Sequence, residues 1–304
     1  MTARAWPELS LADWEPTYLT LHRWTQIAGK IRLALAPWMN HWWQTPLYVT
    51  SDGLTTSAMP YRDRHLTITF DFCAHRLVAH TSDDHRDGFP LEPMAVADFY
   101  QKMVELLARL EVEVAIRPVP VEVADTTPFT QDRGHASYQR EQVERLHRIL
   151  LSAARVFNHH RGRFLGKSSP VHFFWGAFDL AVTRFSGRAN PTPPADPVMR
   201  EAYSHEVISH GFWPGGDWPL GGRMEEAVFY AYAVPEPTGL REARLSPPAA
   251  AWSGAFSEFI LPYRAVRAAA DPDAMLLDFM ESSYLAAATR AGWDVETLRH
   301  PRAD

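Results

Sequence analysis

The chain has 304 residues, which at roughly 150 residues per domain allows two modest domains or one large domain with a sizeable core. Hydrophobic residues make up 46% of the chain and charged residues 22%, so the composition is globular and excludes disordered, collagen-like and coiled-coil classes. The net charge is −6 and no basic run occurs, which argues against a phosphate-binding surface, and we expect no nucleic-acid partner.

The first predicted element is a helix over residues 16–36, because apolar residues recur there at steps of three and four. These residues are Leu21, Trp24, Ile27, Ile31 and Leu35. Pro16 suits the first turn, where a missing N–H costs nothing, and Pro37 marks the end of the helix.

The rest of the first half is predicted to be mostly strands. The clearest strand is Leu66–Phe72, where apolar and polar residues alternate without a break. The other elements expected in this half are strands at 45–50, 54–58, 75–81 and 111–116, a polar turn at 83–88, and a helix from Pro93 to Leu110.

The second half repeats this plan loosely. A long helix over residues 138–164 separates the two halves, and a last helix has Asp271 as its N-cap, Pro272 at its first position and Gly292 just after its end. Between these helices we expect strands at 172–185, 203–210, 226–234 and 257–261.

Each half therefore combines antiparallel strands with a helix that a proline opens. We predict an α+β fold with two antiparallel sheets, each followed by a packed helix, and a diverged tandem repeat is one explanation of this plan. The halves, residues 1–130 and 131–304, form either two domains or one compact unit.

Membrane and secretion signals are missing from the sequence. Charges interrupt its apolar segments before the roughly 20 residues that a membrane span needs. The opening residues contain no apolar stretch of the signal-peptide type, and the single cysteine, Cys73, cannot form an internal disulfide. We therefore expect a cytoplasmic protein without a membrane partner.

The densest group of unusual residues lies in the segment 171–188. If residues 178–185 form a strand, its period of two places Asp179, Ala181, Thr183 and Phe185 on one face. An acid, a hydroxyl and a small residue could form the floor of a ligand pocket. The alternative is an ordinary sheet face turned to solvent or to a loop.

A second group contains His205, Glu206 and His210. The two histidines are five residues apart rather than four, so neither a helix nor a strand presents both to one metal ion. A metal site would need a distant histidine such as His41 or His172. Without a metal, His205 and Glu206 could act as an acid–base pair, with Asp179 orienting one of them. The alternative is that Glu206 pairs with an arginine, Arg184 or Arg188.

Tryptophans supply candidate walls for a ligand site. The segment 211–219 places Trp213 among turn-forming residues and is predicted to be a loop that closes over a ligand or a rigid plug. In Asn40-His-Trp-Trp-Gln44, only one of Trp42 and Trp43 can face a given cavity. The motifs G-x-G-x-x-G, Walker A and G-x-S-x-G are absent, so nucleotide cofactors lose their best support and the cofactor stays unknown.

Two long segments carry a resemblance to a known family: His172-Phe-Phe-Trp-Gly-Ala-Phe-Asp-Leu-Ala-Val-Thr-Arg-Phe-Ser-Gly-Arg188 and Gly211-Phe-Trp-Pro-Gly-Gly216. The segments 24–30, 40–44, 46–50 and 53–57 share it. Together they resemble an uncharacterised bacterial family defined only as a domain of unknown function. The resemblance covers about Trp6 to Trp293 and implies a single bacterial cytoplasmic protein, but no substrate, cofactor or catalytic residue.

The leading functional hypothesis is an enzyme that processes a small, partly apolar molecule in an aromatic-lined pocket. Its candidate catalytic residues are His205, Glu206, Asp179 and His172. Its candidate substrate-binding residues are Trp43, Trp175, Arg184, Arg188 and Trp213. A non-catalytic ligand-binding protein is the first alternative. A mononuclear metalloprotein with ligands among His172, His205 and His210 is the second.

Overall fold

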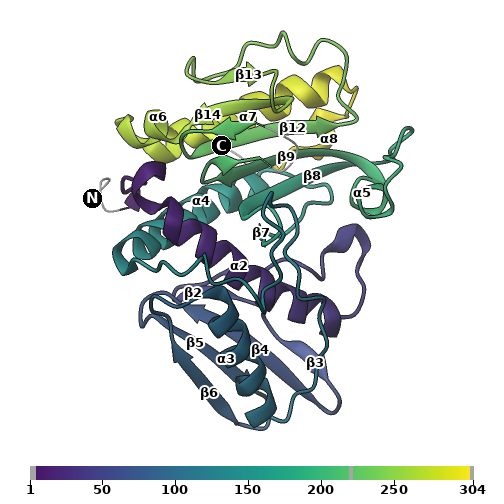
Figure 1. Cartoon of the computed structure of the whole chain (residues 1–304). Coiled ribbons are helices and arrows are strands. Elements are labelled where there is room, and N and C mark those ends of the chain that lie inside the picture. The colour runs from purple at the N-terminus through teal and green to yellow at the C-terminus, as the bar shows by residue number, and fades with distance from the viewer. Residues whose placement is uncertain (1–4, 219–221, 302–304) are drawn as a thin grey trace.

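The computed structural model describes residues 5–218 and 222–301. Two antiparallel sheets and helices on their faces confirm the predicted α+β class. In Figure 1 the first sheet lies at the bottom, the second sheet at the top, and the first long helix passes between them.

The first long helix, α2 (Leu11–Leu35), starts earlier than predicted, with Ser10 as its N-cap residue. Pro16 lies inside the helix, so its expected place in the first turn was wrong. Trp14, which is fully buried, stacks on Tyr18 with ring centroids 5.0 Å apart. Because Pro16 lies beyond the first turn, the helix lacks the hydrogen bond that this position would otherwise donate, and the packing of Trp14 and Tyr18 helps to offset that cost. A short 3₁₀ turn, η1 (Asn40–Trp42), follows.

The first sheet has five strands in the order β1-β2-β4-β5-β6, with a further strand, β3, paired to β4. They are β1 (Tyr48–Val49), β2 (Gly53–Thr55), β3 (Met59–Tyr61), β4 (Arg64–Asp71), β5 (Arg76–Thr81) and β6 (Arg86–Pro90). The alternation predicted around residues 66–72 is confirmed, since Leu66, Ile68 and Phe70 are buried.

Two expectations for this half were wrong. Residues 86–90, placed mainly in a polar turn, pair with β5 as strand β6, because backbone hydrogen bonds hold an edge strand even where its side chains are polar. Residues 111–116, expected as a strand, form none. After α3 (Val96–Arg109) the backbone turns at Glu111, with φ of 55°, and Val112 donates back to the carbonyl of Leu107 over 2.8 Å.

The second sheet has the strand order β13-β14-β12-β9-β8-β7. Its strands are β7 (His172–Phe174), β8 (Asp179–Ala189), β9 (His205–Trp213), β12 (Val228–Val234), β13 (Ala251–Ser253) and β14 (Glu258–Pro262). A separate two-stranded sheet contains β10 (Gly216–Asp217) and β11 (Arg223–Met224).

Two predictions about these strands need correction. The strand expected over residues 172–185 is two strands, because Phe178 adopts φ of 61° and its N–H donates to Phe174, which closes a turn. Residues 211–213, expected in a closing loop, belong to β9 and pair with β12. Backbone hydrogen bonds to both β8 and β12 keep this segment extended, although Gly211 by itself favours a turn. The end of that expected loop, Pro219, lies outside the described residues.

Helices cover one face of the second sheet. The long helix α4 (Arg140–Gly162) and the helix α7 (Pro272–Arg290) pack against it, and both were predicted. Asp271 caps α7 by accepting from the Ala274 N–H over 3.0 Å, and Gly292 follows with φ of 63°, as expected. The remaining helices are α5 (Pro197–Ala202), α6 (Tyr263–Ala268) and α8 (Val295–Leu298).

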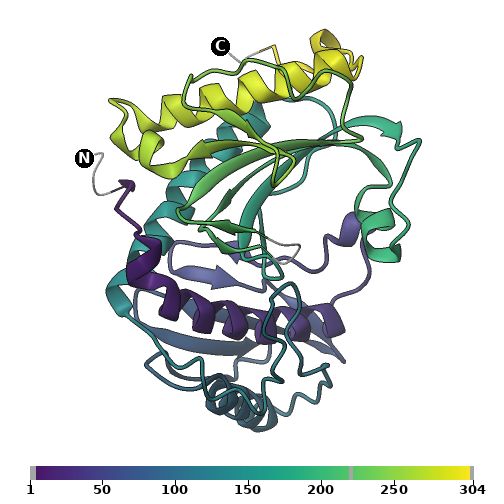
Figure 2. The ribbon, with the colours of Figure 1, turned by 45° about the horizontal axis from the view of Figure 1, so that its top comes forward.

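Helix α2 packs against both sheets. Trp24 stacks on Phe99 of α3, with ring centroids 4.7 Å apart, in the core of the first sheet. Tyr18 contacts Phe178, next to strand β8, edge to face at 5.0 Å. Figure 2 shows α7 on one side of the second sheet and α2 on the other. One cluster of buried apolar side chains therefore contains residues of both halves.

Candidate functional site

The two faces of the second sheet differ in chemistry. The residues of β8 and β9 that face α4 and α7 are mainly apolar, and include Leu180, Val182 and Phe212. The opposite face has polar side chains from four strands. We call it the polar face, and it contains Asp179, Thr183, Ser209, Tyr230, Tyr232 and Glu258. The face that the sequence assigns to Asp179, Ala181 and Thr183 is thus the one that the structure turns away from α4 and α7.

A contact between Asp179 and Tyr230 lies near the end of this face at which β9 ends with Trp213. The Tyr230 hydroxyl, from β12, donates a hydrogen bond to Oδ2 of Asp179, at the start of β8. Strand β9 lies between the two strands, and Gly211 is the β9 residue opposite Tyr230. A Cβ atom on Gly211 would lie 2.1 Å from Cζ of Tyr230. The missing side chain therefore lets the phenol cross β9 and reach the carboxyl group.

Burial controls the ionisation of Asp179. It raises the pKa of Asp179 to about 7, the hydrogen bond from Tyr230 opposes this rise, and the negative charge of Glu122 adds to it. Burial also raises the pKa of Glu258 to about 8, with a contribution from the charge of Asp179. The charges that shift these two carboxyl groups are therefore other carboxylates. Asp179 therefore keeps its proton to a much higher pH than an exposed aspartate does.

Further hydroxyl groups lie on the same face as the two acids. The Tyr203 and Tyr232 hydroxyls lie 2.9 Å apart, and Thr183 contacts Ser209 through its side-chain oxygen. Burial raises the pKa of Tyr203 to about 12 and that of Tyr232 well above its usual value, so both phenols keep their protons at neutral pH. The polar face therefore offers several neutral donors and acceptors beside an ionisable carboxyl group.

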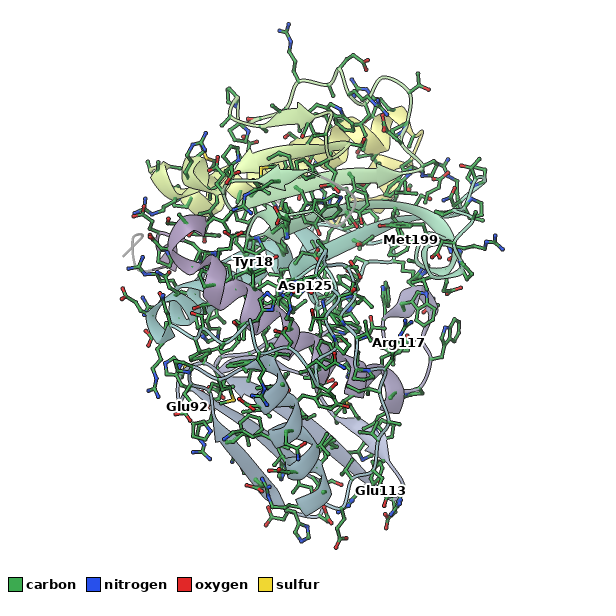
Figure 3. All side chains as sticks on the ribbon, in the orientation of Figure 1. Tyr18, Glu92, Glu113, Arg117, Asp125 and Met199 are labelled. Carbon is green, nitrogen blue, oxygen red and sulfur yellow. The ribbon has the colours of Figure 1, made fainter. Side chains whose placement is uncertain are left out.

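Aromatic rings border one end of the polar face. Trp213 packs edge to face on Trp218 at 5.4 Å and lies 6.2 Å from Phe256. Trp213 also belongs to a small buried cluster with Tyr230. Tyr18 approaches from α2, and Figure 3 labels it where this helix passes below the second sheet. This arrangement places the candidate wall residue Trp213 next to Asp179 and Tyr230.

The structure does not bring Glu206 to Asp179. Glu206 faces the opposite side of β9, where Nη2 of Arg188 donates to it over 2.7 Å. This is the ion pair that the sequence left open as an alternative. Glu206 also lines a cavity of about 280 Å³ together with Ile208, Arg290 and Trp293.

His205 lies at the other end of β9 from the Asp179–Tyr230 contact. Asp179 begins β8 next to the end of β9 at Trp213, and His205 starts β9, so roughly 26 Å of strand separates them. The His205 ring contacts His41 edge to face at 5.5 Å. The candidate residues His205, Glu206 and Asp179 therefore do not meet in one site.

Two further candidates lie on the helix side of the sheet. Nε2 of His210 and the Ser283 hydroxyl of α7 lie 2.9 Å apart. Arg184 is 1% exposed, pairs with Glu281 over 3.2 Å and stacks on the Tyr284 ring. Burial lowers the pKa of His210 well below its usual value, so it is neutral. Neither residue faces Asp179.

The candidate residues Trp175 and His172 are both packed against neighbouring side chains or backbone. The Trp175 ring lies against Gly29 of α2, and its indole N–H donates to the Thr45 carbonyl over 2.8 Å. His172 pairs with Ala181, and its ring contacts Trp43 at 5.8 Å. Burial lowers the pKa of His172 to about 3, so the ring is neutral at physiological pH.

The histidines named as candidate metal ligands occupy different surroundings. His210 faces the helices, His205 contacts His41, and His172 contacts Trp43. Over the described ranges, the structure contains no group of three or more histidine, cysteine, aspartate or glutamate side chains arranged to hold a metal ion.

Comparison with known proteins gives a family. A model described as "Family of unknown function (DUF5996)" matches residues 6–300. The chain belongs to this family. The match confirms the resemblance seen in the sequence over nearly the whole chain, and the family's description assigns no activity. A search of curated proteins and a search of solved structures gave no match. Within residues 5–218 and 222–301, no helix has the length and apolar character to cross a bilayer.

Sequence reasoning missed Tyr230, Tyr232, Glu258 and Gly211 as members of the site. A signal for the tyrosines is present, because Tyr230-Ala-Tyr-Ala-Val234 alternates large and small residues and so places both phenols on one face of a strand. The meeting of Tyr230 with Asp179 depends on the strand order β12-β9-β8, which no local pattern reveals.

Proposed function

We propose that the protein is an enzyme that transfers protons to and from a small molecule at the polar face of the second sheet. The observation that carries this proposal is the buried Asp179 carboxyl group, which accepts from the Tyr230 hydroxyl and has a pKa of about 7. A group with a pKa near the working pH can both give and take a proton, so it suits general acid–base catalysis.

The groups around Asp179 indicate the kind of substrate. Tyr203, Tyr232 and Ser209 provide hydroxyls for hydrogen bonds, and Trp213 provides an aromatic wall. Such a mixture favours a small molecule with a polar reacting group and an apolar part. In this assignment Asp179 is the acid–base group and Tyr230 is its hydrogen-bond donor. This replaces the earlier hypothesis that His205 and Glu206 carry out the chemistry.

The proposal includes where the protein works and what it meets there. The single cysteine, Cys73, is exposed and free, which fits a reducing compartment, and we propose the cytoplasm. The net charge of −6 favours a small-molecule partner over a nucleic acid.

Turnover of metabolite pools would test the proposal. Purified protein is incubated with fractionated cell metabolites, and mass spectrometry records which compounds disappear and which appear. We expect at least one conversion, which Asp179→Asn abolishes because the amide cannot exchange the proton. His205→Gln serves as the matched variant and keeps the conversion. Binding that both variants retain, without any conversion, would overturn the enzyme proposal in favour of a ligand-binding protein.

A further inference from the structure

Lysine is rare in this chain. Of its 30 lysine and arginine residues, only Lys30, Lys102 and Lys167 are lysines. The difference matters chemically, because a lysine amine can lose its proton and act as a nucleophile, whereas the arginine guanidinium stays charged in proteins. The groups around each lysine amine therefore decide whether it can act as a nucleophile.

Lys167 lies between α4 and β7 and has an uncommon partner. Its Nζ is 2.8 Å from Nε2 of His41. The other ring nitrogen of His41, Nδ1, lies 3.3 Å from the Ala202 carbonyl, which can only accept a hydrogen bond. This contact holds the proton on Nδ1 and leaves the lone pair of Nε2 directed at the lysine. Nε2 is therefore a proton acceptor.

The fold holds His41 firmly in this position. The side chain is 4% exposed, and the backbone adopts φ of 59°, a left-handed conformation that is uncommon for histidine. Its N–H donates to Oε1 of Glu201 over 3.0 Å. Burial and the nearby Lys167 charge both lower the pKa of His41, so the ring is neutral at physiological pH. The acceptor is thus oriented before any ligand arrives.

Aromatic rings form the rest of the surroundings of Lys167. Nζ lies 5.1 Å from the Trp43 ring centre and 5.0 Å from that of Phe185. Burial of the amine lowers the pKa of Lys167, and the charge of Glu201 opposes this change. The side chain as a whole remains exposed, so a small molecule can reach it. His205 completes the cluster through its ring contact with His41.

We propose that Lys167 is a nucleophilic amine that condenses with an aldehyde or ketone bearing an apolar group, and that His41 accepts its proton. His41 Nε2 takes a proton from the ammonium group, and the free amine attacks the carbonyl carbon. The carbon–oxygen double bond opens to a carbinolamine. The His41 imidazolium then protonates the hydroxyl group, which leaves as water. The ammonium and the carbonyl compound thus give one protonated imine and one water, and Trp43 and Phe185 contact the apolar group.

The other two lysines provide internal controls. Lys30 lies over the Trp175 ring at 5.8 Å, and the charge of Arg117 acts on it. Lys102, on α3, lies 5.9 Å from the Phe89 ring centre. Within the part of the chain that the structure describes, neither lysine contacts a histidine ring nitrogen. Comparing the three lysines therefore distinguishes the effect of an aromatic ring on the reactivity of the amine from the effect of His41.

Reductive trapping with benzaldehyde tests the proposal. The intact protein is treated at pH 7 with benzaldehyde and cyanoborohydride, and peptide mass spectrometry measures the benzyl adduct at each lysine over time. We expect Lys167 to react at least about tenfold faster than Lys102, because His41 accepts the proton of its ammonium group and so exposes the free amine. Equal rates at Lys167 and Lys102 would overturn the proposal.

Variants separate the role of His41 from mere exposure. His41→Gln should reduce the rate at Lys167 about tenfold while Lys102 is unaffected. His65→Gln, which changes an exposed histidine, should leave the rate at Lys167 unchanged. Circular dichroism and the melting temperature establish that His41→Gln is folded, and the rate at Lys102 in the same sample reports any loosening of the chain. A folded His41→Gln variant with an unchanged rate at Lys167 would contradict the assigned role of His41.

Discussion

The Tyr230 ring lies over the α-carbon of Gly211, and this contact is what connects β12 to Asp179 on β8. A tyrosine on one strand rarely reaches an acid two strands away, because the side chains of the strand between them fill the space. Here the strand between them has no side chain at the crossing point. The geometry of the candidate site therefore depends on one glycine in the middle of a strand, where glycine is otherwise unfavourable.

Gly211→Ala is expected to displace Tyr230. The new Cβ would lie 2.1 Å from Cζ of the ring, so the phenol must move away from Asp179. Such overpacking costs about 1–3 kcal/mol in the free energy of unfolding, which urea denaturation measures. Gly162→Ala is the control, since a Cβ there meets no atom within 4 Å. Equal stability of the two variants would show that the crossing is not tight.

Asp179→Asn is expected to change how stability depends on pH. Burial raises the pKa of Asp179 from 3.8 to about 7, so between these values the folded chain holds a proton that the unfolded chain has released. The free energy of unfolding therefore falls as pH rises, by at most about 1.4 kcal/mol per pH unit. Asp179→Asn removes this contribution, and urea denaturation between pH 4.5 and 7 should show a less negative slope. Asp63→Asn, at an exposed position, should keep the wild-type slope.

Tyr230→Phe is expected to raise the pKa of Asp179 further. The Tyr230 hydroxyl donates to the carboxyl group and so favours its charged form. Carbon-13 NMR of labelled aspartate carboxyls follows the titration of Asp179 directly. Tyr203→Phe, which loses the contact with Tyr232 but leaves the donor to Asp179 in place, should shift the midpoint less. A midpoint that falls in Tyr230→Phe would mean that the phenol does not stabilise the carboxylate.

Arg188→Gln is expected to destabilise the protein more than Glu206→Gln. Arg188 is half exposed, so its ion pair with Glu206 contributes less than about 1 kcal/mol. The arginine also donates to the carbonyls of Ala291 and Gly292, where α7 ends. Arg188→Gln loses both kinds of contact, whereas Glu206→Gln loses only charge. A lower melting temperature for Glu206→Gln than for Arg188→Gln would show that the hydrogen bonds of Arg188 to the carbonyls contribute less than its ion pair.

His172→Gln is expected to reduce sensitivity to acid. Burial lowers the pKa of His172 to about 3, so below pH 6.5 this histidine binds a proton in the unfolded chain but stays neutral in the folded chain. Stability is thus lost as pH falls from about 6.5 toward 3. The variant should show a smaller loss than the wild type in urea denaturation at pH 4 and pH 7. The exposed His65→Gln is the control, and it should lose as much stability as the wild type.

Local patterns predicted those elements whose periodicity or caps are strong. One example is the alternation around Leu66–Phe72, and another is the set of helix-end residues Asp271, Pro272 and Gly292. Each pattern consists of residues close together in sequence, and the structure contains the strand and the helix that they predict. The missed strand β6 has polar side chains, so only its backbone pairing with β5 identifies it. The extension of β9 through Trp213 has the same origin, since its partners come from distant segments.

The candidate site shows the same division. The face of Asp179, Ala181 and Thr183 follows from the period of one strand, and the sequence analysis found it. The choice of partners did not follow, because His205 and Glu206 are prominent in the sequence whereas Tyr230 lies in an ordinary apolar run. Three-dimensional strand order, rather than residue type, decides which groups meet Asp179.

Helix α2 has a consequence for any attempt to divide the chain. Its Trp24 belongs to the packing around Phe99 in the first half, and its Tyr18 packs on Phe178 beside the polar face in the second. A fragment that starts after this helix would expose Phe178 to water and lose one edge of the surroundings of Asp179. Work on the chemistry of the second sheet therefore has to begin with the N-terminal helix in place, and the two sheets should melt in one cooperative step.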